Sequence, residues 1–202
     1  MAVLENLLGI DNQAELAKAE EKLSKVRAKE LVEVGMIDAF EIGTFKGLSQ
    51  IHGYLFQDIY PFAGQIRTVD LAKGQFRFAP IVYLKQALSQ IEKMPQKEYD
   101  DIIGKYVEMN VAHPFREGNG RATRIWFDQI LKANLQKVVD WNLVDKDEYL
   151  TAMILSPVSD LQIKELLKGA LTDKINDHEM FFKGIDASYY YEGYTEFKTS
   201  DL

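Results

Sequence analysis

The chain contains no cysteine and only three histidines among its 202 residues. Disulfide bonds, thiolate metal sites and cysteine nucleophiles are therefore excluded. A cysteine-free sequence fits a reducing compartment, and we expect a cytoplasmic protein. The first fifteen residues lack the basic start and apolar run of a signal peptide. We also expect no membrane partner, because no stretch is long and apolar enough to span a bilayer.

An excess of positive charge is missing as well. The chain has 24 Lys and Arg against 31 Asp and Glu, a formal net charge of -7. Nucleic-acid binding needs a basic surface, so we expect no nucleic-acid partner. A small phosphate ligand stays compatible with this balance, because a few local arginines can override the global sign. With 47% hydrophobic and 27% charged residues, the composition fits one globular domain, with or without a small appendage.

Apolar residues recur at helical spacing along most of the chain, and no internal repeat is present. His52 lies on the apolar stripe of the second such segment, so we interpret it as a packed core residue rather than a ligand. The aromatic tail contains one further short helix that ends at Gly193. We predict the other helices over 12–34, 45–59, 81–94, 98–112, 120–133, 145–155, 159–171 and 178–182.

One segment, residues 64–78, breaks the helical pattern. Apolar and polar residues alternate around Val69 and Leu71 and again around Phe76 and Phe78. The residues between them, 72–75, have the composition of a turn. The segment therefore predicts a β-hairpin, and the chain as a whole is predicted to be mainly α with this one hairpin.

Residues 113–124, HPFREGNGRATR, contain the parts of an anion site. Gly118, Asn119 and Gly120 open a helix, and glycines let backbone N–H groups approach an anion at a helix N-terminus. Arg121 and Arg124 lie three residues apart on that helix, where their guanidinium groups suit phosphate oxygens. Taken singly, the glycine turn is ordinary and the arginines are typical of a solvated helix face. Their joint occurrence within twelve residues favours a phosphate site.

The same segment supplies a base and a metal ligand. His113, with a reference pKa of about 6.5, is suited to general base catalysis. Alone, a histidine before proline is also typical of a helix end. Glu117 offers a carboxylate oxygen that suits Mg²⁺ beside substrate phosphates. Neither the GxxxxGK[ST] loop nor the GxGxxG motif is present.

These twelve residues match the signature of a known family. HPFREGNGRATR resembles the Fic signature HxFx[D/E]GNGRxxR at every specified position. LFQDIYPFAGQIR, residues 55–67, resembles the segment that leads into the Fic flap, and the hairpin at 67–78 takes the flap's place. The resemblance predicts a mainly helical Fic domain over 1–183, with its core at about 48–133. A C-terminal inhibitory helix and tail are predicted over 184–202.

Fic proteins usually transfer AMP from ATP to a side-chain hydroxyl of a target protein, so the resemblance implies a protein adenylyltransferase acting on Tyr, Thr or Ser. It implies that His113 deprotonates the hydroxyl and that Glu117 holds Mg²⁺. The anion hole would be Gly118, Asn119 and Gly120, with Arg121 on the phosphates and Arg124 on the γ-phosphate. Asn110 and Lys73 are further candidates for ATP contacts. The flap would bind the target's backbone by strand addition.

The tail carries a second family motif. SYYYEG, from Ser188 to Gly193, resembles the inhibitory motif [S/T]xxxE[G/N] of Fic proteins. The resemblance implies that Glu192 pairs with Arg124 and keeps it from the γ-phosphate. Ser188 and Glu192 are four residues apart and share a helical face. The hydroxyls between them are candidates for self-modification: Tyr189, Tyr190 and Tyr191.

Three functions are therefore compatible with the sequence. The first is a self-inhibited protein adenylyltransferase. Some relatives transfer UMP, phosphocholine or a γ-phosphate instead. The phosphorylating relatives depart from the signature at the second glycine, so the intact Gly120 favours AMP transfer, while the choice of base stays open. The second is the reverse reaction, in which Glu192 and a metal at Glu117 help to remove AMP from modified proteins; one protein could catalyse both. The third is a non-catalytic nucleotide-binding module or toxin partner, which the intact His113 disfavours. Assembly into a homo-oligomer, the target protein and the physiological metal stay open.

Overall fold

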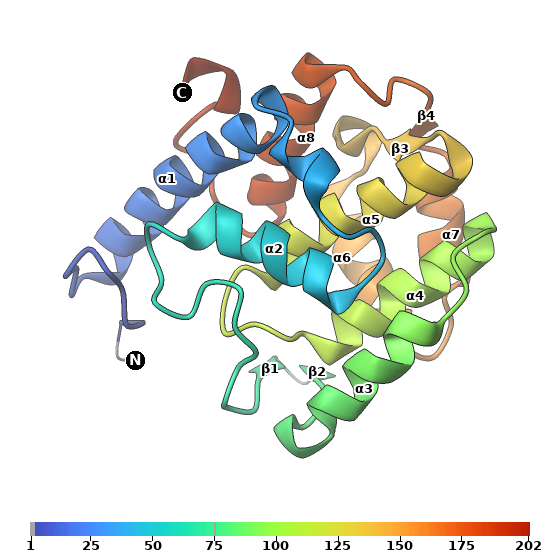
Figure 1. Ribbon diagram of the computed structural model, residues 1–202, viewed down its shortest axis with the longest axis horizontal. Coiled ribbons are helices and arrows are strands. Elements are labelled where there is room, and N and C mark those ends of the chain that lie inside the picture. Colours follow the sequence, from blue (N-terminus) through green and yellow to red (C-terminus); the bar gives the residue numbers. More distant parts are fainter. Residues whose placement is uncertain (1–2, 75) are drawn as a thin grey trace.

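The computed structural model describes residues 3–74 and 76–202, and it is mainly helical, as predicted (Figure 1). The helices of this part of the chain are α1 (Gln13–Glu33), α2 (Phe45–Phe56), α3 (Ile81–Lys93), α4 (Tyr99–Ala112), α5 (Asn119–Leu135), α6 (Lys146–Leu155), α7 (Leu161–Lys168) and α8 (His178–Tyr191). Short 3-10 turns occur at Met36–Ala39, Trp141–Leu143 and Thr199–Asp201.

Helix α5 lies in the middle of the molecule, with α2, α4 and α8 packed around it (Figure 1). Its side chains at Ala122, Trp126, Phe127 and Ile130 are fully buried. Burying each large apolar side chain stabilises the fold by roughly 1.5–3 kcal/mol. The start of α5 carries the glycine turn, so the candidate phosphate site rests on the most firmly packed helix of the domain.

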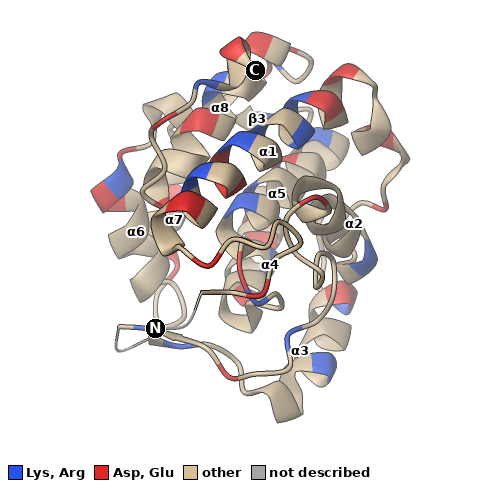
Figure 2. Cartoon of the chain, turned by 90° about the vertical axis from the view of Figure 1, so that its left-hand side faces the viewer, with Lys and Arg blue, Asp and Glu red and all other residues tan. Residues whose placement is uncertain are grey.

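Helix α1 spans one side of the molecule and contacts both α2 and α8. It begins at Asn12, whose side chain accepts the N–H groups of Ala14 and Glu15. Acidic and basic residues are interspersed along it (Figure 2). Three of these charged residues, Glu20, Glu21 and Lys25, are buried rather than solvated, which the amphipathic pattern alone does not predict.

The predicted hairpin is present but shorter than expected. Strand β1 (Ala72–Lys73) pairs antiparallel with β2 (Phe76–Arg77). The predicted turn at 72–75 was therefore too wide, because two of its residues belong to a strand, and Gln75 lies outside the described residues. Val69 and Leu71 precede the strand. The hairpin lies at the edge of the molecule, below α2 and beside α3 (Figure 1).

A second pair of strands was not predicted. Strand β3 (Val138–Val139) pairs antiparallel with β4 (Leu171–Thr172). Two residues per strand are too few to show alternation, so the pattern gives no signal. The pairing also explains why α7 stops at Lys168 although the apolar pattern continues to Leu171.

The tail forms one helix where two were predicted. Helix α8 runs without a break from His178 to Tyr191 and includes Gly184, and the predicted boundary between 183 and 184 falls inside it. Gly184 packs close to Trp141, where an added Cβ would lie 3.4 Å from the indole. This is an ordinary contact distance, so Gly184 lies within a regular, packed helix. No helix in the described part of the chain has the length and apolar character needed to cross a membrane.

Candidate active site

A cavity of about 500 Å³ opens between the flap, the start of α5, α6 and the end of α8. Its size lies within the range typical of small-molecule sites. The predicted residues that line it are Lys73, Asn110, His113, Glu117, Gly118, Asn119, Gly120, Arg121, Arg124 and Glu192. Ser188, Gly193 and the three tyrosines of the tail do not line it. The structure thus brings the flap, the twelve-residue motif and the tail glutamate to one place.

His113 ends helix α4 in a left-handed conformation, with φ at 49°. Its carbonyl oxygen accepts a hydrogen bond of 2.7 Å from Nε of Arg67. Its ring stacks on Phe78 of the flap, with 3.6 Å between ring centroids. Burial lowers the pKa of His113 to about 4, although the carbonyl of Asn110 favours the charged form. Nδ1 has no hydrogen-bond partner among the described residues, and the ring is a neutral proton acceptor near pH 7.

The glycine turn is held by side chains around it. Oδ1 of Asn119 accepts from the N–H of Phe115 at 2.8 Å, and Nδ2 donates to its carbonyl oxygen at 2.7 Å. Asn119 therefore offers a ligand its backbone N–H, not its side chain. Gly118 has φ at 75°, and a Cβ there would lie 2.5 Å from the ring of Phe56. The first N–H groups of α5 lack intrahelical partners and form an anion-binding position.

His52 lies beneath this turn. Its Nδ1 accepts from the N–H of Gly64 at 2.9 Å, so Nε2 carries the proton and donates to the carbonyl oxygen of Glu117 at 2.8 Å. The ring stacks on Phe115, and burial lowers the pKa of His52 to about 3. The prediction of a core histidine is confirmed. Its support of the turn was missed, because the partner residue is 65 positions away.

The side chain of Glu117 is 42% exposed and faces the cavity. Oε1 accepts from the N–H of Gly118 at 2.9 Å and from Nη2 of Arg121 at 3.2 Å. Within residues 3–74 and 76–202 no cluster of three or more metal-ligating side chains occurs. Proteins often hold Mg²⁺ by one carboxylate together with water and substrate phosphates, so Glu117 stays the candidate metal ligand.

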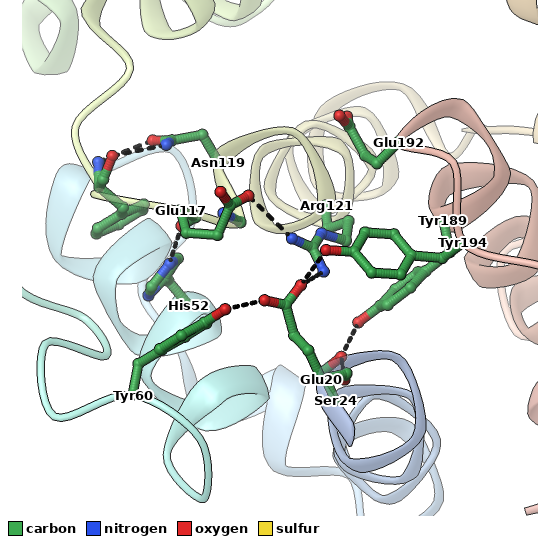
Figure 3. A network of polar contacts seen from close by, with 12 residues as sticks. Glu20, Ser24, His52, Tyr60, Glu117, Asn119, Arg121, Tyr189, Glu192 and Tyr194 are labelled. Atoms are coloured by element: carbon green, nitrogen blue, oxygen red, sulfur yellow. Dashed lines mark hydrogen bonds and ion pairs between the residues drawn. The ribbon is translucent and has the colours of Figure 1, made fainter. Parts of the chain in front are cut away.

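Arg121, which the resemblance assigns to the phosphates, lines the cavity and has two carboxylate partners in this structure. Its guanidinium is buried between α5 and α1, where Nη1 donates to Glu20 and Nη2 to Glu117 (Figure 3). Three aromatic rings pack against it, those of Phe56, Tyr189 and Tyr194. In this structure Arg121 therefore links Glu20 to Glu117, the candidate metal ligand.

Arg124 makes the predicted contact with the tail. Its Nη2 lies 3.0 Å from Oε1 of Glu192 and donates to the carbonyl oxygen of Ser188 at 2.9 Å. Nε donates to Oγ of Ser188 at 2.7 Å, and Nη1 donates to the hydroxyl of Tyr149 at 3.3 Å. The side chain of Arg124 is only 3% exposed. Each of its nitrogen atoms is therefore engaged, and Glu192 is the one carboxylate among these partners.

Glu192 occupies the start of α5. A Cβ added to Gly120 would lie 2.5 Å from its Oε1, and Nζ of Lys73 is 3.6 Å from its Oε2. Burial alone would raise the pKa of Glu192, but the cations Arg124 and Lys73 lower it to about 2. Gly193 follows with φ at 93°, which suits the end of α8. An ionised carboxylate thus sits where the resemblance places the ATP phosphates.

The three tail tyrosines differ in exposure. The hydroxyl of Tyr189 donates to Oγ of Ser24 at 2.6 Å, and that of Tyr191 lies 2.9 Å from each of two backbone carbonyl oxygens, to which its one proton can be donated. Both side chains are buried. Tyr190 is 51% exposed. Of the three candidates for self-modification, Tyr190 is therefore the exposed one in this arrangement of α8, and the modification itself stays a prediction.

Several lining residues were missed from the sequence. Phe78 covers His113, and α6 provides an apolar wall from Leu150, Met153 and Ile154. The amphipathic pattern of 145–155 predicted a helix there but not which cavity it faces. Only the packing of α6 beside α7 and α8 decides this.

Comparison with known proteins agrees with the geometry. Residues 44–131 match the Fic/DOC family. The chain is 33% identical over 165 residues to protein adenylyltransferase VbhT of Bartonella schoenbuchensis, covering 76% of this chain and 34% of that protein. It is 30% identical to a probable protein adenylyltransferase, y4lH, of Sinorhizobium fredii, covering 79% and 85%. The chain belongs to the Fic/DOC family, and it spans about a third of the length of VbhT.

Solved structures share the fold. The N-terminal FIC domain of Bep8 from Bartonella sp. 1-1C superposes with a TM-score of 0.73 at 17% identity, covering 87% of this chain and 93% of that one. BepC from Bartonella tribocorum, solved with bound AMPPNP, gives a TM-score of 0.67 at 22% identity, covering 84% and 92%. At these identities the likeness concerns the fold alone.

Proposed function

We propose that this protein is a self-inhibited adenylyltransferase that moves AMP from ATP to a Tyr, Thr or Ser hydroxyl of a target protein. One observation carries the proposal: a neutral His113 and the free N-terminus of α5 line one cavity, in which Glu192 takes the place of an anion. Relatives named as protein adenylyltransferases support this reading.

The geometry suggests how the transfer proceeds. The triphosphate lies on the N–H groups of Asn119 and Gly120 at the start of α5, where the helix dipole favours negative charge. The target oxygen attacks the α-phosphorus, its proton passes to His113, and the bond to pyrophosphate breaks. Glu117 would hold Mg²⁺, which would supply positive charge beside the phosphates. The gain in rate comes mainly from positioning and charge stabilisation.

The remaining walls bind the other parts of the substrates. The apolar side chains of Leu150, Met153 and Ile154 suit the adenine ring, because bases are commonly bound against apolar surfaces. The flap lies at the mouth of the cavity, and its short strands leave backbone groups for a target segment added as a further strand.

Inhibition follows from competition for Arg124. Glu192 and a γ-phosphate are both anions, and both need the same guanidinium. While Glu192 holds Arg124, ATP lacks this ligand and its phosphates are displaced from the position needed for attack. Loss of the Glu192 contact then allows the productive geometry.

Mass spectrometry of lysate proteins tests the proposal. Lysate is incubated with ATP, Mg²⁺ and the Glu192→Gly protein, and the same protein carrying His113→Ala serves as the control. We expect AMP on hydroxyl side chains of particular proteins with the first variant and none with the second. Transfer of UMP, of phosphate or of nothing with the active variant contradicts the proposal.

A second function, removal of AMP from modified proteins, is supported by the ionised state of Glu192. Its carboxylate lines the same cavity as His113 and Glu117, where it can accept a proton from an attacking water. Incubating an AMP-modified target with wild-type protein and with Glu192→Gln tests this function. AMP should be released by the wild type alone; equal release by both proteins rules out this role of Glu192.

A further inference from the structure

Outside the twelve-residue motif, a buried carboxylate of α1 reaches the candidate metal site. Glu20 is 2% exposed, and its carboxylate accepts hydrogen bonds from Arg121, from the hydroxyl of Tyr60 and, at 2.8 Å, from that of Tyr194 (Figure 3). The second terminal nitrogen of Arg121 holds Glu117. Glu20, Arg121 and Glu117 therefore form a continuous chain of three charges, which ends at the cavity.

The burial of these three charged groups determines which of them carries the unbalanced negative charge. Two carboxylates and one guanidinium sum to one negative charge. Glu20 and Arg121 are both buried, and buried charges are stable in proteins when they are paired and hydrogen-bonded. Glu117 is 42% exposed at the cavity. The unbalanced negative charge therefore resides on Glu117, where a divalent cation can reach it.

Without the carboxylate of Glu20, the same arginine would act against metal binding. Arg121 lies within hydrogen-bonding distance of Glu117, and it would then have that group as its only carboxylate partner in this network. The pair would be neutral and would attract a cation far less strongly. The buried partner thus turns Arg121 from a competitor of the metal into a support for its ligand.

We propose that Glu20 is a positioning residue for the metal site: by pairing with Arg121 it keeps Glu117 oriented and negatively charged for a divalent cation. This inference rests on the proposed role of Glu117 in the adenylyltransferase. It identifies a functional contribution from α1, which lies about a hundred residues before the motif and outside the segment that matches the family.

Binding of Mn²⁺ tests the inference without catalysis. Mn²⁺ affinity is measured by electron paramagnetic resonance with AMPPNP, in the Glu192→Gly background. Glu20→Gln keeps the shape and a hydrogen-bond acceptor but removes the charge. We expect it to weaken Mn²⁺ binding by about tenfold, the order of effect of one unit charge within about 10 Å. Binding of AMPPNP without metal should stay the same.

A double variant distinguishes an effect on the charge at Glu117 from a general disruption of the hydrogen-bond network. Glu20→Gln with Arg121→Gln removes both buried charges and again leaves one negative charge on Glu117. We expect Mn²⁺ affinity to return to within about threefold of the parent. A purely structural role of Glu20 predicts the opposite, since the double variant disrupts the network further. If circular dichroism shows that Glu20→Gln alone does not fold, the Mn²⁺ affinity of the double variant tests the inference. A double variant that binds Mn²⁺ as weakly as Glu117→Gln overturns it.

Two controls complete the experiment. Glu21→Gln removes an equally buried carboxylate of the same helix, one that pairs with Lys25 instead of Arg121. It changes the net charge by the same amount and should leave Mn²⁺ affinity unchanged. Glu117→Gln should abolish tight Mn²⁺ binding, and its failure to do so refutes the proposed metal ligand itself. Loss with Glu117→Gln but parent-like affinity with Glu20→Gln refutes only the role of Glu20.

Discussion

Replacing Glu192 by glycine removes the carboxylate that holds Arg124 at 3.0 Å. The other partners of Arg124, Ser188 and Tyr149, are uncharged and remain in place. Glu192 is the residue that caps α8 and has φ at -92°, so glycine fits there without rearrangement of the helix. The substitution therefore frees the charge of Arg124 for the γ-phosphate while leaving α8 packed.

The size of the effect follows from this contact. A hydrogen bond that involves charged groups contributes about 1.5–3 kcal/mol. The second cation near Glu192, Lys73, is 70% exposed and adds little. Since about 1.4 kcal/mol corresponds to a factor of ten, we expect AMP transfer to rise by roughly ten- to one-hundredfold.

Transfer of label from α-³²P-ATP to protein at subsaturating ATP measures this rise. Glu196→Gly is the matched control: it removes another tail glutamate, whose ion pair with Lys18 is exposed and makes no contact with α5. That variant should label at the wild-type rate. An unchanged rate with Glu192→Gly, or an equal increase with both variants, refutes the competition for Arg124.

Two further predictions concern the histidines. Phe78→Ala exposes the ring of His113, so the pKa of His113 should rise from about 4 toward 6.5. In the Glu192→Gly background, the labelling rate at pH 6 divided by that at pH 8 should then fall. An unchanged ratio contradicts the role of Phe78 in burying His113. For His52, burial lowers the folded-state pKa to about 3, whereas the unfolded value is about 6.5. Between these values only the unfolded chain gains the proton, so His52 makes the free energy of unfolding fall by about 1.4 kcal/mol for each unit of acidification below pH 6.5. The free energy of unfolding, measured with urea at pH 6 and at pH 5, should fall less between these pH values for His52→Gln than for the wild type. An equal fall in both proteins would disprove the assignment of a buried, neutral His52.

The parts of the site that are close together in the sequence were predictable. His113, Pro114 and the glycine turn lie between two helix ends, and local rules for proline, glycine and helix termini place them correctly. The pairing of Glu192 with Arg124 was also expected, although 68 residues separate them. That expectation came from the resemblance of the tail motif, because residue spacing alone says nothing about such a distant contact.

Composition and helical periodicity determined the mainly helical fold, and twelve contiguous residues predicted the candidate base, anion site and metal ligand. Only the tertiary structure decided which groups Arg121 and Arg124 contact. The guanidinium of Arg121 is buried against α1, because α1 brings Glu20 to it across about a hundred residues of sequence, and the same guanidinium reaches Glu117. The sequence specifies which side chains are charged, whereas the packing of α1 against α2 and α8 determines which of these charged groups are in contact.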